Sequence, residues 1–134
     1  MEGAMVGLIL AVLLLYVIQT YLHAMIMSRS LGAKVLHHGG GPRDEALPLT
    51  INAGRAKRAV ANMNEAMMVF LPLALLAVHF GLNSGLAWWG ALVFLLARAA
   101  YVPAYITAIG LTRSVVWTLG HVGLAMMAAA VWMA

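Results

Sequence analysis

Three long stretches of the sequence contain no Asp, Glu, Lys or Arg, and they cover residues 3–28, 66–97 and 114–134. The second stretch is divided by a short run of small and polar residues, 81–85, that is typical of a turn. A membrane-spanning helix needs about 20 predominantly apolar residues. The pattern therefore predicts four spanning helices, over about 3–28, 50–79, 86–109 and 113–132. The first stretch lacks the basic start of a signal peptide, so we expect it to remain as a span.

The predicted connections are short, apart from a polar loop over residues 29–49. Within that loop, the run from Gly39 to Pro42 is expected to interrupt regular structure. Thr50 or Asn52 is expected to cap the helix that follows. Short connections make successive helices antiparallel. We therefore predict an all-α membrane protein, a four-transmembrane-helix up-down bundle that forms a single domain over residues 1–134.

Composition supports a membrane protein and suggests its orientation. The 134 residues are 64% hydrophobic and only 9% charged, which is more apolar surface than a soluble domain of this size can bury. All eight Lys and Arg lie on, or extend toward, the side that holds loop 29–49 and turn 110–112. The positive-inside rule then places both connections in the cytosol and both termini outside it. In a bacterial inner membrane the termini are periplasmic.

The sequence contains no cysteine, which excludes disulfides and a protein thiol nucleophile, so any thiol must come from a substrate. His37 and His38 have no carboxylate or Cys partner at helical spacing, so we interpret them as loop residues and expect no metal. Gln19 and His23 are interpreted as the polar end of the first span. No basic patch is interleaved with aromatic residues, so a nucleic acid is not expected as a partner.

A polar stripe lies at the start of the second predicted span. With about 100° per residue on a helix, Arg55, Arg58, Asn62 and Glu65 fall within roughly 80° of one another, whereas Lys57 points elsewhere. Charged side chains in a spanning helix are costly and seldom face lipid. We therefore expect this stripe to face other helices or a polar cavity, and we take it as a candidate functional site.

A second stripe lies on the third predicted span, where Arg98, Tyr101 and Tyr105 share one face within about 60°. A rise of about 1.5 Å per residue puts Arg98 and Glu65 at similar depth, so we expect an ion pair between them. Arg113 opens the fourth span on the same side. Together these residues predict a pocket for an anionic ligand, because guanidinium groups bind carboxylates through paired hydrogen bonds. The alternative is that they only hold the helices together.

The spacing of these residues resembles the MAPEG family, the membrane-associated proteins in eicosanoid and glutathione metabolism. The matching motifs are Arg58-Ala-x-x-Asn62-x-x-Glu65, Arg98-x-x-Tyr101-x-x-x-Tyr105, Arg113-Ser114 and His38-Gly39-Gly40. Their order and spacing and the four-span topology agree over almost the whole chain. The resemblance implies a homotrimer with three glutathione sites between neighbouring subunits, open to the cytosol.

The resemblance also implies roles for individual residues. Those that hold glutathione are Arg58, Asn62, Glu65, Arg98, Tyr101 and Tyr105, with Arg55 at a neighbouring basic position. Arg113 is implied as the catalytic residue, because an Arg at the start of the fourth span stabilises the glutathione thiolate in this family. Glutathione is then a co-substrate, and neither a metal nor a redox cofactor is implied.

Ala66 after Glu65 and the short first loop resemble the small bacterial branch of the family more than its eicosanoid synthases. We therefore expect a glutathione-dependent membrane transferase or peroxidase that acts on lipophilic electrophiles or hydroperoxides from the bilayer. The alternative is a non-catalytic glutathione-binding or scaffold protein of the same fold. A small multidrug transporter is disfavoured, because such transporters use a membrane carboxylate for cations and here the Arg residues outnumber it.

Overall fold

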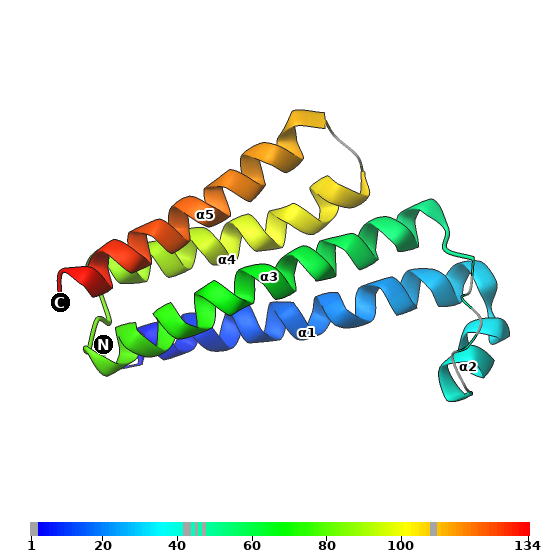
Figure 1. Cartoon of the computed structure of the whole chain (residues 1–134), viewed down its shortest axis with the longest axis horizontal. Coiled ribbons are helices and arrows are strands. Elements are labelled where there is room, and N and C mark those ends of the chain that lie inside the picture. The colour runs from blue at the N-terminus through cyan, green and yellow to red at the C-terminus, as the bar shows by residue number, and fades with distance from the viewer. Residues whose placement is uncertain (1–2, 42–43, 45, 47, 108–109) are drawn as a thin grey trace.

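The computed structural model describes residues 3–41, 44, 46, 48–107 and 110–134, and over these the chain forms four long helices and a short one. The long helices are α1 (Ala4–Leu31), α3 (Ile51–His79), α4 (Gly85–Ile106) and α5 (Gly110–Trp132), and the short one is α2 (Ala33–Gly40). The long helices run side by side in alternating directions, and both termini lie at one end (Figure 1). All four are long and apolar enough to cross a membrane. The predicted up-down bundle of four spanning helices is therefore confirmed.

The two ends of the bundle differ in what they carry. The end with both chain termini and the turn between α3 and α4 is called the terminal end. The other, called the α2 end, carries α2, the start of α3, the end of α4 and the start of α5 (Figure 1). The Thr50 hydroxyl accepts a hydrogen bond from the Ala53 backbone N–H at 3.2 Å, so the predicted cap of α3 is confirmed at Thr50.

The prediction of a loop over residues 29–49 is wrong in part. α1 continues to Leu31, and α2 follows directly after Gly32, which has a φ of 56°. A glycine tolerates this positive φ, so the chain changes direction there and resumes as a helix. The glycines expected to interrupt regular structure lie only at the last turn of α2, where a helix ends at little cost. The fourth span also begins three residues earlier than expected, at Gly110 rather than Arg113.

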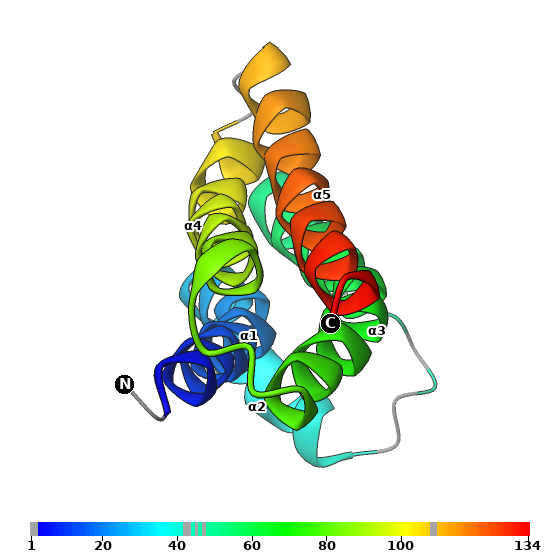
Figure 2. The same cartoon turned by 90° about the vertical axis from the view of Figure 1, so that its left-hand side faces the viewer.

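Small residues and an aromatic pair close the terminal half of the bundle. A Cβ added at Gly90 would lie 2.7 Å from the Gly123 carbonyl oxygen, and one at Gly123 would lie 2.6 Å from the Gly90 carbonyl oxygen. Only glycine allows this backbone approach between α4 and α5, and small residues are typical of contacts between membrane helices. Phe70 of α3 stacks on Phe94 of α4 with ring centroids 4.6 Å apart. The end-on view in Figure 2 shows α4 beside α5 and α1 beside α3.

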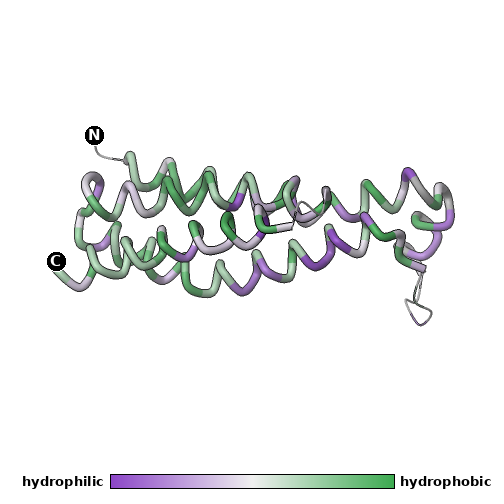
Figure 3. The backbone as a smooth tube through the Cα atoms, turned by 90° about the horizontal axis from the view of Figure 1, so that it is seen from above, coloured by the Kyte–Doolittle hydropathy of each residue, from purple (hydrophilic) through white to green (hydrophobic). Residues whose placement is uncertain are grey.

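Polar positions lie mainly in the other half, toward the α2 end, as the purple segments in Figure 3 show. The buried apolar cluster there is small, and it consists of Ala59, Ala97, Tyr101 and Val116 with the partly buried Tyr105 packed against it. The large core cluster instead extends from Met63, near the middle of α3, to Met5 at the terminal end, and it includes both phenylalanines of the stacked pair. The candidate site therefore lies next to a large packed core on one side, and only a small apolar cluster surrounds the site itself.

Candidate functional site

Arg98 is the most deeply buried charged side chain of the described residues, with 2% of its surface exposed. Its Nη1 donates a 2.7 Å hydrogen bond to Oδ1 of Asn62, which joins α4 to α3. Its Cζ lies 5.3 Å from the ring centroid of Phe94 and 5.5 Å from that of Tyr101, within range of cation–π attraction. Its Nε and Nη2 have no hydrogen-bond partner in the described chain. The site therefore holds a buried cation whose donors are only partly used.

Two neighbours hold this part of α4 in place. Gln19 of α1, 3% exposed, donates from Nε2 to the backbone carbonyl of Arg98 at 3.4 Å. The sequence interpretation of Gln19 as a polar helix end is therefore wrong, because its side chain is buried between helices. On the other side, a Cβ added at Gly120 of α5 would lie 3.4 Å from Nε and 3.5 Å from Nη2 of Arg98. Gly120 thus leaves room for the guanidinium against α5.

The predicted ion pair between Glu65 and Arg98 is wrong for the described chain. Arg98 uses its one hydrogen bond on Asn62, which lies one turn closer to the α2 end of α3. The side chain of Glu65 is exposed, and within the part of the chain that the structure describes it forms no hydrogen bond or ion pair. Equal depth in the membrane therefore did not suffice for pairing.

Tyr105 lies between two guanidinium groups. Its hydroxyl accepts a 3.2 Å hydrogen bond from Nε of Arg58, whose Cζ lies 5.9 Å from the ring centroid. The Cζ of Arg113 from α5 lies 5.2 Å from the same centroid. The ring of Tyr101 is also close, with 5.5 Å between the two tyrosine centroids. The structure therefore brings together residues of α3, α4 and α5 that the sequence placed on separate stripes.

Arg55 is turned toward the end of α4. Its Nη1 donates a 2.9 Å hydrogen bond to the backbone carbonyl of Ile106, the last residue of that helix. The last carbonyls of a helix lack partners within the helix, and a cation there also offsets the negative end of the helix dipole. This contact ties α3 to α4 beside the tyrosines and sets the position of Arg55.

A cleft of about 460 Å³ opens between α4 and α5 next to this cluster. Its described lining contains three of the predicted site residues, Tyr101, Tyr105 and Arg113, and three further residues of α5, namely Ser114, Trp117 and Thr118. Trp117 and Thr118 were not singled out from the sequence. They follow Arg113 and Ser114 at a spacing of four, so the helical period alone places them on the same face.

The cleft combines aromatic walls with positive charge. Its described lining holds no carboxylate. Arg58 and Arg98, which are not part of that lining, contact Tyr105 and Tyr101. Volumes of about 300–1,000 Å³ are usual for small-molecule sites. Fold and site together define a four-span membrane protein with a basic cleft between two of its helices.

A family comparison agrees with this class. The family model described as the MAPEG family matches residues 8–133, nearly the whole chain, and the chain therefore belongs to the MAPEG family. No curated protein matches the chain closely enough to be counted as a relative. The protein is thus an integral multi-pass membrane protein of a family related to glutathione metabolism, and the resemblance stated from the sequence is confirmed.

Proposed function

We propose that the protein is a glutathione-dependent membrane transferase or peroxidase that activates the thiol of glutathione for attack on lipophilic electrophiles or hydroperoxides. The observation that carries the proposal is the cleft beside Tyr105, where Arg58 and Arg113 approach one ring from two helices. Family membership supports glutathione as the ligand. The cleft suits the carboxylates of that peptide, because charge-assisted bonds from guanidinium groups are strong and directional.

The proposed binding residues divide into two groups. Arg58, Tyr101 and Tyr105 line or adjoin the cleft, and Arg98 and Asn62 support it from within the bundle. Arg55, at the neighbouring basic position, is also proposed to bind glutathione, and its hydrogen bond to Ile106 fixes one edge of its guanidinium. Among the described residues the buried Arg98 forms no ion pair, and an anionic ligand offsets the cost of an unpaired buried cation.

Arg113 is the proposed catalytic residue. The pKa of a free thiol is about 8.5, so only a minority is ionised at neutral pH. A cation at the sulfur favours the thiolate, which is the nucleophile. The Arg113 side chain is exposed in the first turn of α5 and lines the cleft, so it can reach a ligand there. The helix N-terminus adds a smaller favourable field for an anion.

We further propose a homotrimer in which each glutathione lies between neighbouring subunits, with the α2 end in the cytosol. The exposed Glu65 supports this arrangement. It lies at the middle of the α3 span, where a charge facing lipid is unfavourable. A neighbouring subunit against that face removes Glu65 from lipid and lets it contribute to the same site. The apolar groove between subunits then admits the second substrate from the bilayer.

The experiment that tests the proposal is the ultraviolet difference spectrum of glutathione mixed with the detergent-purified protein, followed by turnover with an aryl halide. The wild type is expected to show a thiolate band and conjugation. Arg113→Ala should lose the band and most of the turnover, with a modest change in glutathione affinity, and Arg113→Lys should recover part of both. Arg29→Ala is the matched control, because Arg29 is exposed at the end of α1 outside the cleft lining.

The same experiment separates the two readings of the site. A thiolate band without conjugation of any electrophile tried would favour the alternative, a glutathione-binding or scaffold protein of the same fold. A full band and rate in Arg113→Ala would show that another group activates the thiol, and the catalytic assignment would be abandoned.

A further inference from the structure

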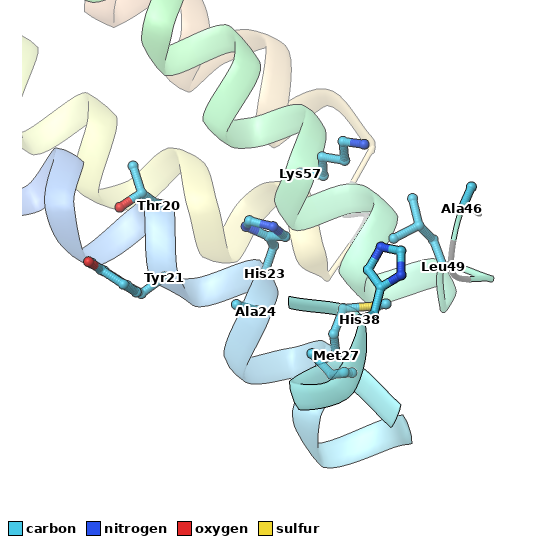
Figure 4. A pocket seen from close by; sticks show the side chains of 10 residues that line it. Thr20, Tyr21, His23, Ala24, Met27, His38, Ala46, Leu49 and Lys57 are labelled. Carbon is cyan, nitrogen blue, oxygen red and sulfur yellow. The ribbon is translucent and has the colours of Figure 1, made fainter. Parts of the chain in front are cut away.

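A second cavity, of about 490 Å³, lies at the α2 end on the other side of the bundle. It is formed by the last turns of α1, by α2, by Ala46 and Leu49 before α3, and by Lys57 of α3 (Figure 4). It shares no described lining residue with the cleft beside Tyr105. Its α1 residues belong to the spanning segment Ala4–Arg29, whereas its α2 residues lie outside every candidate span. The cavity therefore straddles the boundary between the membrane and the solvent.

Three of the polar side chains that line this cavity are basic, and the other two, Thr20 and Tyr21, carry hydroxyl groups. Figure 4 shows the side chains of Lys57, His23 and His38 around it. The described lining contains no Asp or Glu. Nδ1 of His23 is buried and has no hydrogen-bond partner in the described chain, which is uncommon for a buried polar atom. The proposed glutathione site uses none of these three residues.

The rest of the wall is apolar. Met27 is buried, and Ala24, Val35 and Leu49 contribute further aliphatic surface. The Thr20 hydroxyl already donates a hydrogen bond to the Val17 carbonyl at 2.7 Å, so it needs no acceptor from a ligand. A ligand that suits this wall has an alkyl part, and one that suits the three basic side chains has an anionic head.

We propose that this cavity binds a single-chain anionic amphiphile, a long-chain carboxylate of the fatty-acid type. Its carboxylate lies against the ammonium group of Lys57 and the imidazole groups of His23 and His38. Its chain lies along Met27 and the neighbouring aliphatic side chains toward the bilayer. The volume lies in the range of single small-molecule sites, which favours one chain over a two-chain phospholipid. The site is independent of the proposed glutathione chemistry.

Two other ligand classes fit less well. A metal ion needs a third ligand, and among the described residues no group of three His, Cys, Asp or Glu side chains lies close enough to hold one. A small inorganic anion uses the basic groups but leaves the aliphatic wall exposed. Only an amphiphile uses both parts of the lining, and the boundary position matches the place where such molecules concentrate.

The test is the binding of tritiated palmitate to the full-length protein in detergent, measured by scintillation proximity with unlabelled competitors. Lys57→Gln should weaken palmitate binding at least tenfold, and His23→Leu should weaken it further. Lys34→Gln is the matched control for the first change, because Lys34 is exposed on α2 outside the lining. His79→Leu is the control for the second, since His79 is exposed at the terminal end. Both controls should bind as the wild type does.

The competitors identify the occupant. Palmitate should displace the label at least tenfold better than hexadecanol, which has the chain without the charge. Phosphatidylglycerol and inorganic phosphate should compete poorly. Equal competition by hexadecanol, by phosphatidylglycerol or by phosphate would overturn the proposal, as would equal binding by Lys57→Gln and Lys34→Gln. Lys57 is exposed, so its substitution tests the site even if His23→Leu does not fold.

Discussion

The two halves of the bundle differ in how closely α4 and α5 pack against each other. In the terminal half, α4 and α5 touch backbone to backbone at Gly90 and Gly123, and a stacked pair of phenylalanines fills the centre. In the half toward the α2 end, the same two helices leave a cleft of about 460 Å³ with Arg113 at its wall. The boundary between the halves is Arg98, which lies against Phe94 on one side and Tyr101 on the other.

The difference shows how a small membrane bundle combines stability with a binding site. Lipid is as apolar as the core, so close packing rather than hydrophobic burial holds the helices together. The glycines and aromatics of the terminal half provide that packing. The other half is then free to hold guanidinium groups, tyrosines and an open cleft. Substitutions in the first half are therefore expected to affect stability, and those in the second to affect ligand binding.

Gly123→Ala should have the largest effect on stability. Its Cβ would lie 2.6 Å from the Gly90 carbonyl oxygen and 2.8 Å from the Phe94 backbone nitrogen, and backbone atoms cannot move aside cheaply. Overpacking of this kind costs about 1–3 kcal/mol or more. The thermal midpoint in detergent measures it. Gly7→Ala is the control, because a Cβ there meets nothing within 4 Å and alanine favours a helix. Equal midpoints for the two variants would refute the tight contact.

Asn62→Ala should have the next largest effect, because it removes the one side-chain hydrogen bond that the buried Arg98 forms among the described residues. Hydrogen bonds to charged groups contribute about 1.5–3 kcal/mol. The double variant Asn62→Ala with Arg98→Met should recover part of the loss, since no charge is then buried. Thermal midpoints of the singles and the double form a cycle that isolates this pair. Strict additivity would mean that the two side chains do not depend on each other.

Glu65→Gln should have the smallest effect on the stability of one subunit. Glu65 is exposed, and within the described chain no partner is lost, so a change within about 0.5 kcal/mol is expected. Glutathione affinity should nevertheless fall, because we propose that Glu65 joins the site between subunits. Calorimetric titration with glutathione and a thermal scan of the same sample report both quantities. A large fall in the midpoint with unchanged affinity would instead assign Glu65 to subunit packing alone.

The hydrophobic pattern sufficed to predict the fold. Four apolar stretches of sufficient length leave few arrangements in a membrane, because every backbone group must be bonded within its own helix. The ends of the helices were predicted less accurately. α2 was missed because the polar composition of residues 29–49 indicated a loop, whereas the glycines end the helix only at its last turn.

The structure brings most of the candidate residues together, but their contacts could not be predicted from the sequence. Helical periodicity put Tyr105 and Arg98 on one face, and the structure confirms that both contact residues of α3. Periodicity and depth did not reveal that Arg98 bonds Asn62 rather than Glu65. Nor did they reveal the carbonyl of Ile106 as the partner of Arg55. Backbone acceptors leave no signal in the sequence.

The most direct test of the account is an equilibrium titration of the detergent-purified protein with glutathione and with its uncharged diester. We propose that the half of the bundle toward the α2 end recognises carboxylates through its guanidinium groups. Each lost charge-assisted contact should cost about 1.5–3 kcal/mol, which is about tenfold or more in affinity. The diester should therefore bind at least tenfold more weakly than glutathione. Equal affinity for the two ligands, or no binding of glutathione at all, would contradict the account.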